Sequence, residues 1–221
     1  TKVEGYAAGE WDAEIGGYKV EAAGTVPLTE AFRIRIADLN EDYHGWLNNS
    51  LSKHMEPRRR ENVVRATAAY DTDNISATLK FEHGYVSVSG NPFEIVSVAA
   101  NRPPDLTKEA LSSLGPDFDK VLTDNYAGNI SVKLGDFTLA SITGYSRYKS
   151  DQREDADFFE RDLAYSTFQE GFRQVSQEFR VLSPTGKTIE FVGGAYWHDS
   201  HLLERRATGS LLAPEIGRAH V

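Results

Sequence analysis

A pair of histidines is the first feature of this chain whose residue types could do chemistry. His198 and His201 flank Asp199 and Ser200, and imidazole and carboxylate groups are frequent metal ligands. Positions three apart on a β-strand point to opposite faces, however, so the two rings would not converge on one ion. We therefore favour a strand end that runs into a loop, and we predict no metal site.

Carboxylates crowd a second stretch of the chain. The acidic residues there are Asp151, Glu154, Asp155, Asp157, Glu160 and Asp162. Carboxylate oxygens bind Ca²⁺ or cationic ligands, but the ordered spacing of a calcium-binding loop is missing here. A solvated acidic loop is the favoured interpretation.

Arg58, Arg59 and Arg60 form a short positive cluster. Guanidinium groups bind phosphates well, so contact with the phosphates of lipopolysaccharide is one interpretation of this cluster. A charged rim that only keeps the surface solvated is the other. The whole chain has 24 Lys+Arg against 33 Asp+Glu, a net charge of -9, which argues against a nucleic-acid partner.

Catalytic motifs are missing from the sequence. It contains no nucleophile elbow, no glycine loop for phosphates and no metalloprotease helix. Without a cysteine, neither a thiol nucleophile nor a disulfide is possible. We predict that the chain is not an enzyme and needs no cofactor.

The elements that carry these residues show the two-residue period of β-strands about nine times. The clearest example runs from Ile75 to Tyr85, where Leu79 and Phe81 alternate with Lys80 and Glu82. Successive strand side chains point to opposite faces, so this segment has one apolar and one polar face. Several such strands run about 10 to 13 residues, and a tilted strand crosses a bilayer with about 9 to 11.

The connections between the strands alternate in length. The short ones are 27–30, 71–74, 134–136 and 183–187, and the long ones are 43–59, 87–127 and 150–170. Bacterial outer-membrane barrels have this asymmetry, with short turns on one side of the membrane and longer loops on the other. Their polar lumen also explains a mean hydropathy of -0.46.

We therefore expect an all-β, antiparallel, up-and-down transmembrane barrel, present here as an incomplete barrel, an open curved sheet of about nine strands. Aromatic residues near the strand ends are compatible with the interfacial girdles of such barrels: Trp11, Tyr18, Tyr43, Trp46, Tyr70, Tyr85, Tyr148, Tyr196 and Trp197. The alternatives are a soluble β-sandwich with a binding or adhesin role, and a smaller, complete porin-like barrel. A sandwich would need apolar inner faces on both sheets, and charged strand faces argue against it.

Several motifs resemble those of TonB-dependent outer-membrane receptors, in the order in which that family has them. They are GTVPLTE at 24–30, FRIR at 32–35, GWLNN at 45–49, SITGY at 141–145, VSQEFRVLSP at 175–184 and FVGGAY at 191–196. Their order and spacing together are more specific than any one motif. The resemblance covers residues 1–212 and implies the N-terminal part of a barrel of about 22 strands with a plugged lumen.

The resemblance also implies a place in the outer membrane of a Gram-negative bacterium. The implied function is energised uptake of a large nutrient, such as an iron-siderophore complex, vitamin B12 or an oligosaccharide. The implied partners are the TonB-ExbB-ExbD complex, the lipid bilayer and lipopolysaccharide. The family's plug and TonB box would precede Thr1. Residues 213–221 continue no pattern and resemble a translated sequencing adapter, so we expect this tail to lie outside the barrel.

The long connection 87–127 is the candidate for recognition, because long loops on a rigid scaffold often bind ligands. A short helical stretch from Leu106 to Leu114 is expected within it. The candidate substrate-binding residues are Asn91, Pro92, Phe93 and Arg102.

Overall fold

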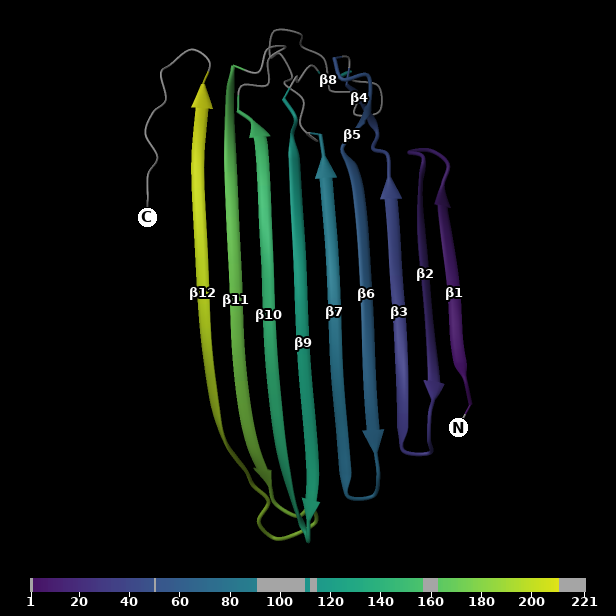
Figure 1. Ribbon diagram of the computed structural model, residues 1–221, viewed down its shortest axis with the longest axis vertical. Helices are drawn as coiled ribbons and strands as arrows, with labels where there is room; N and C mark the ends of the chain where they lie inside the picture. Colours follow the sequence, from purple (N-terminus) through teal and green to yellow (C-terminus); the bar gives the residue numbers. More distant parts are fainter. Residues whose placement is uncertain (1, 50, 91–109, 112–114, 157–162, 211–221) are drawn as a thin grey trace.

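A nine-stranded antiparallel sheet is the main element of the computed structural model, which describes residues 2–49, 51–90, 110–111, 115–156 and 163–210 (Figure 1). The strands are β1 (Glu4–Asp12), β2 (Gly17–Pro27), β3 (Phe32–Tyr43), β4 (Leu47–Asn49), β5 (Met55–Glu56), β6 (Arg58–Asp71), β7 (Ile75–Ser89), β8 (Ala110–Leu111), β9 (Phe118–Leu134), β10 (Phe137–Asp155), β11 (Ala164–Leu182) and β12 (Val192–Ser210). The main sheet has the order β1-β2-β3-β6-β7-β9-β10-β11-β12. The predicted fold class, an open up-and-down sheet, is confirmed. Over the described ranges, no helix is long and apolar enough to cross a membrane.

Each strand pair in the main sheet keeps one register along its whole length. The β10–β11 pair, for example, runs without a skipped residue from Thr138 opposite Leu182 to Asp155 opposite Tyr165. Residues directly opposite each other project from the same side of an antiparallel sheet. The register therefore assigns every strand residue to one of two faces.

One side of the sheet, which we call the apolar face, carries most of the large hydrophobic side chains. Its members in the half nearer the short turns include Phe32, Ile34, Ile36, Tyr70, Leu79, Phe81, Tyr126, Ile130, Leu139, Tyr145, Val175, Phe179 and Trp197. Several are well exposed: Leu79 by 61%, Phe179 by 58% and Ile130 by 51%. The opposite side, the polar face, carries residues such as Arg65, Glu82, Asn125, Ser146 and Glu178.

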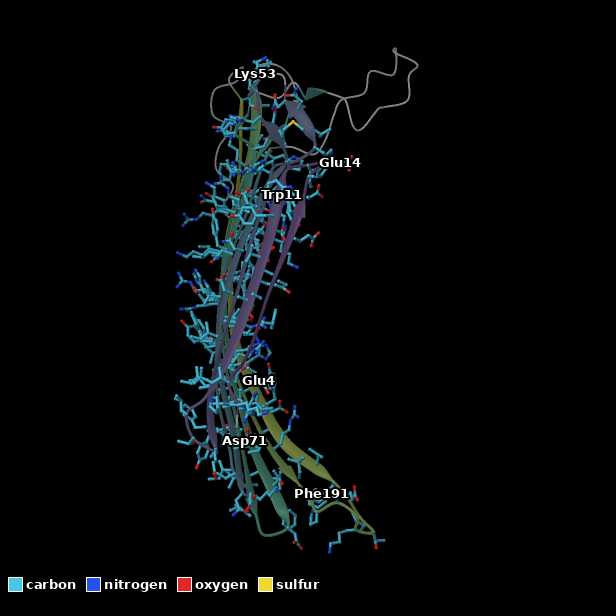
Figure 2. The ribbon with its side chains drawn as sticks, turned by 90° about the vertical axis from the view of Figure 1, so that its right-hand side faces the viewer. Glu4, Trp11, Glu14, Lys53, Asp71 and Phe191 are labelled. Carbon is cyan, nitrogen blue, oxygen red and sulfur yellow. The ribbon has the colours of Figure 1, made fainter. Side chains whose placement is uncertain are left out.

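Nothing in the described chain covers the apolar face. The sheet is a single curved layer when it is seen from its edge (Figure 2). Among the described residues, the buried hydrophobic side chains are only Ala23, Leu47 and Ala69. A β-sandwich would instead bury its apolar side chains between two packed sheets. The apolar face therefore needs an apolar partner outside the chain described here.

The connections separate by length between the two ends of the sheet only in part. The connections 44–57, 90–117 and 156–163 join strand ends at one end, which we call the loop end (Figure 1). The connections 28–31, 72–74, 135–136 and 183–191 join strand ends at the other, the turn end. The first three of these turns are short as predicted, whereas 183–191 is longer than 156–163 at the loop end. The brief β1–β2 turn, 13–16, is also at the loop end.

The strands are longer than the sequence pattern predicted. β10, β11 and β12 each have 19 residues, and β9 has 17. The predicted connections 87–127 and 150–170 were therefore too wide, because β9 already begins at Phe118 and β11 at Ala164. Near the loop end both faces carry polar side chains, so the hydrophobic alternation stops while the backbone pairing continues.

A small second sheet organises the first long connection at the loop end. β4 pairs with β5 in antiparallel and with β8 in parallel orientation. Because Ala110 and Leu111 form β8, the predicted helix from Leu106 to Leu114 is wrong at these positions, and its other residues lie outside the described ones. Gly45 has a φ of 92°, and a Cβ there would meet the carbonyl oxygens of Glu56 and Pro57 at 2.7 Å. Glycine is thus required where the chain enters this sheet.

Candidate functional site

A row of hydrogen-bonded polar side chains crosses the middle of the polar face. Arg65 Nε donates to Glu82 Oε2 at 2.6 Å, and Asn125 Nδ2 donates to Glu82 Oε1 at 3.4 Å. Ser146 Oγ then donates to Asn125 Oδ1 at 2.7 Å, so the row joins β6, β7, β9 and β10. Gln174 of β11 lies directly opposite Ser146 and continues the row. These groups form a hydrophilic wall that can hydrogen-bond a polar solute.

Further ion pairs extend this wall over the rest of the polar face. They are Arg33–Asp71 at 2.7 Å, Arg180–Glu178 at 2.5 Å and Arg206–Glu204 at 2.6 Å, and Tyr148 donates a hydrogen bond to Glu170. Lys80 and Glu82, which the sequence placed on the polar face of their strand, lie on this face, and so do Glu178 and Arg180. Glu82 is paired across strands, whereas Glu178 and Arg180 pair along β11.

The half of the apolar face nearer the turn end carries the large hydrophobic side chains, and we call it the hydrophobic half. An aromatic row lies along its border with the half nearer the loop end. The Phe81 and Tyr126 rings are 5.0 Å apart, and the Tyr126 and Tyr145 rings are 5.7 Å apart. Such a row is typical of the interfacial girdles of membrane barrels. The residues of this row were not among the aromatic residues predicted for girdles, and of the predicted ones Tyr43, Tyr148 and Tyr196 lie on the polar face.

The polar residues inside the hydrophobic half satisfy one another. Thr143 Oγ1 donates to Gln177 Oε1 at 2.6 Å, and Gln177 Nε2 donates to Ser141 Oγ at 2.9 Å. A polar group in an apolar medium is costly unless it has such partners. This part of the face is therefore suited to a water-free environment despite these side chains.

The arginine cluster is divided between the two faces and is matched by carboxylates. Arg58 donates to both oxygens of Asp42, at 2.9 and 2.6 Å, and Arg60 lies 3.4 Å from the same carboxylate. Arg59, on the polar face, pairs with Glu41 at 3.0 Å and with Glu61. The phosphate contact considered for this cluster would have to compete with these partners.

In the other candidate sites, the side chains do not point toward a common ligand. His198 lies on the polar face and His201 on the apolar face, and no group of three or more potential metal ligands occurs among the described residues. In the acidic stretch, Asp151 and Glu154 point to opposite faces, and the backbone N–H of the buried Asp155 donates a hydrogen bond to Asp117 Oδ1. Asp157, Glu160 and Asp162 lie outside the described residues.

A cleft of about 720 Å³ lies at the loop end, between 52–56 and 115–118. Its strand residues Arg58, Ser89 and Lys120 belong to the apolar side of the sheet, so it does not open onto the hydrophilic wall. The predicted substrate-binding residues Asn91, Pro92, Phe93 and Arg102 lie outside the described residues. The row through Asn125 and Ser146 was not predicted, because only the strand register brings these residues together.

The fold matches a known receptor. The chain superposes on the ferric yersiniabactin uptake receptor FyuA from Yersinia pestis with a TM-score of 0.77 and 12% identity, over 97% of this chain. The sheet has the fold of a TonB-dependent receptor barrel. The chain spans about a third of the length of that receptor, 33%. The sequence is similar to no protein-family model and to no curated protein sequence.

Proposed function

We propose that this chain forms part of the wall of a TonB-dependent transporter in the outer membrane of a Gram-negative bacterium. One observation carries the proposal: long strands combine an uncovered apolar face with a continuous hydrophilic face. Hydrocarbon covers the first face in a bilayer, and a wet or plugged lumen meets the second. Neighbouring strands of the main sheet pair without a skipped residue over the described residues, and a bilayer requires such backbone pairing.

The proposed cargo is a large, hydrophilic nutrient, with an iron-siderophore complex ahead of vitamin B12 or an oligosaccharide. FyuA, which has the same fold, takes up ferric yersiniabactin. The hydrogen-bonding groups of the polar face support a polar cargo or a polar plug, because both need partners along the wall. Energy would come from the TonB-ExbB-ExbD complex at the turn end, since short turns face the periplasm in such barrels.

A localisation and uptake experiment tests this function. The gene that encodes the chain is deleted, and the mutant and complemented cells are fractionated and given ⁵⁵Fe-siderophores under iron limitation. We expect the protein in the outer-membrane fraction, and iron uptake that needs the gene and stops when a protonophore removes the energy supply. Protein found only in the soluble fraction would refute the proposal.

A smaller porin-like barrel is the remaining candidate among membrane proteins, because it would present the same two faces. Uptake that depends on the gene but continues after protonophore treatment would favour this passive channel over the energised transporter.

A further inference from the structure

A band of apolar side chains lies within the polar face, between its hydrogen-bonded row and the loop end. We call it the inner band, and each of its members comes from a different strand: Leu39, Val63, Val86, Val121, Tyr148, Phe172 and Leu202. The register brings these residues together, because Val86 lies directly opposite Val121 and Phe172 lies opposite both Tyr148 and Leu202. Their distance along the sequence hides the grouping.

The inner band presents apolar surface on the side of the sheet that is otherwise hydrophilic. The rings of Tyr148 and Phe172 are stacked, with 5.4 Å between their centroids and 24° between their planes. Leu202, next to Phe172 on β12, is 55% exposed. The lumen of a membrane barrel is polar, and an exposed apolar patch on a wet surface often marks a place of interaction. The inner band is therefore a candidate contact for an apolar group.

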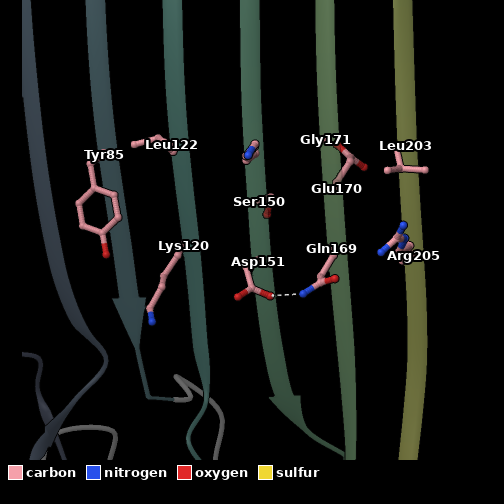
Figure 3. A pocket seen from close by; sticks show the side chains of 11 residues that line it. Tyr85, Lys120, Leu122, Ser150, Asp151, Gln169, Glu170, Gly171, Leu203 and Arg205 are labelled. Carbon is pink, nitrogen blue, oxygen red and sulfur yellow. Dashed lines mark hydrogen bonds between the residues drawn. The ribbon is translucent and has the colours of Figure 1, made fainter.

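Two pairs of glutamates bracket the inner band, and both pairs lie in one row of opposed residues. Glu41 of β3 lies directly opposite Glu61 of β6, and Glu170 of β11 lies directly opposite Glu204 of β12. Two valines of the band and Ser150, which lies opposite Glu170, complete the row between the pairs (Figure 3). Like charges in directly opposed positions destabilise an antiparallel pair. A cation near either pair would reduce this repulsion.

Both pairs keep an excess of negative charge. The first pair shares a single guanidinium group, that of Arg59. In the second pair, Glu204 contacts Arg206 at 2.6 Å, whereas Glu170 accepts a hydrogen bond from the neutral phenol of Tyr148. Within the part of the chain that the structure describes, no other lysine or arginine contacts these four carboxylates. Each pair therefore carries more carboxylates than cations.

Lys19 is the remaining cation near the row, and it does not reverse this balance. It lies opposite Glu41 on β2, but its Nζ contacts Glu21 at 3.9 Å, and Glu10 lies opposite it on β1. Three carboxylates thus surround one ammonium group. The wall beside the inner band is acidic, and its charge is complementary to a cation.

Apolar rings beside carboxylates are suited to an organic cation. The apolar part of such a ligand packs on the rings, and its charge is attracted both to the ring faces and to the carboxylates. A neutral sugar would gain nothing from the carboxylates, and an anionic chelate would be repelled. We infer that the inner band binds a cationic, partly apolar group of the cargo, with its apolar part against Phe172 and Leu202 and its charge beside Glu170 and Glu204. This inference rests on the transport function proposed above and narrows the cargo to molecules with a positive charge.

The test uses four small probes that separate charge from apolar surface: benzyltrimethylammonium, phenylmethanesulfonate, benzyl alcohol and tetramethylammonium. The whole polypeptide, purified in detergent from the outer membranes of the cells that make it, is titrated with each probe. Ligand-observed NMR measures binding, and empty micelles are the blank. The variant Glu170→Gln/Glu204→Gln removes charge beside the inner band, and Phe172→Ser removes a ring. The control Asp73→Asn/Asp136→Asn removes equal charge from two turns at the other end of the sheet.

We expect the wild type to bind benzyltrimethylammonium about tenfold more tightly than benzyl alcohol, and phenylmethanesulfonate more weakly than either, because the carboxylates attract only the cation. Tetramethylammonium, which lacks the ring, should bind about fivefold more weakly than benzyltrimethylammonium. The charge variant should lose the tenfold preference for the cation and bind benzyl alcohol as the wild type does. Phe172→Ser should weaken benzyltrimethylammonium about fivefold but keep the preference for positive charge. The control should bind every probe like the wild type.

Equal affinities of the wild type for the cationic, neutral and anionic ring probes would overturn the inference, and this comparison needs no variant to fold. Binding that the charge variant leaves unchanged would overturn it as well. So would the absence of any binding, which is the result expected if a plug segment rather than the cargo covers the inner band.

The proposed function fails separately from this inference. A protein that is missing from the outer-membrane fraction would refute the transport function, and the role of the inner band in transport with it. A protein that resides in the outer membrane and supports energised uptake, but shows no preference for the cationic probe, would refute only the cation site.

Discussion

The two groups of cations on this sheet differ in what faces them. Arg58, Arg59 and Arg60 are adjacent in the sequence, and each contacts a carboxylate of β3 or β6. The second group lies on the apolar side of the sheet near the loop end, and we call it the β9–β12 basic patch: Lys120, Arg147, Lys149, Arg173 and Arg205. It is scattered along the sequence, and its members have no such partner among the described residues. The cluster that is obvious in the sequence is thus neutralised, and the hidden one keeps its charge.

The comparison shows that charge on a sheet must be counted along rows of opposed residues. Neighbours along a strand point to opposite faces, so Arg59 does not add to the charge of Arg58 and Arg60. Asp42 lies directly opposite Arg60 on β3, whereas Arg147 lies opposite Arg173 on β11. The residues across the row decide whether an arginine is paired or left without a carboxylate.

The largest expected effect comes from moving a cation out of the patch and into the hydrophobic half of the same face. Ile130→Arg should lower the free energy of unfolding by about 2 to 4 kcal/mol, the cost of an arginine facing the bilayer midplane. Urea titration of the whole protein refolded into vesicles measures this value. Asn129→Arg, one residue away on the polar face, is the control and should change stability little. Similar losses for both variants would mean that the two faces are not different environments.

The fold was predictable because a strand with one apolar and one polar face alternates apolar and polar residues along the sequence. The alternation from Ile75 to Phe81 indicated one apolar and one polar face, and the unequal connections indicated the open up-and-down sheet. Prediction failed near the loop end, where residues such as Lys120 and Lys149 occupy apolar-face positions. Polar side chains on both faces leave no alternation to read, so β9 and β11 begin earlier than predicted.

The sites were less predictable than the fold. The polar-face charges Lys80 and Glu82 follow from alternation alone, and the structure places them as expected. The Arg65–Ser146 row and the basic patch depend on register between strands that are far apart in sequence. A single-residue shift of one strand would move its patch residue to the other face, so no local pattern could reveal the grouping.

A second, smaller effect is expected at the neutralised cluster. Asp42→Asn removes the carboxylate shared by Arg58 and Arg60 and should lower the free energy of unfolding by about 1 kcal/mol, the upper range for partly exposed pairs. The urea titration used for Ile130→Arg measures this value. An unchanged free energy of unfolding would contradict the view that the carboxylate partner distinguishes the two groups.

The reverse change should make the basic patch resemble the arginine cluster. Gly171→Asp places a carboxylate beside Lys149 and Arg173 at a position where a new side chain meets no atom within 4 Å. We expect a gain in the free energy of unfolding of about 0.5 kcal/mol, in the range of opposite-charge pairs across strands, and urea titration measures it. Gly171→Asn is the control for the added volume. Equal effects of Asp and Asn would show that the added volume, rather than the neutralised charge, is responsible.

The smallest expected effect isolates the repulsion between Arg147 and Arg173. Arg173→Gln should raise the free energy of unfolding by about 0.3 kcal/mol at low salt, because it removes one of two opposed like charges. At high salt the gain should disappear, since salt screens the repulsion between exposed charges. Thermal unfolding at low and high salt measures both values, and Arg180→Gln, which removes a paired arginine from the polar face, provides the control. A gain of the same size in both conditions would mean that repulsion between these two residues is not its cause.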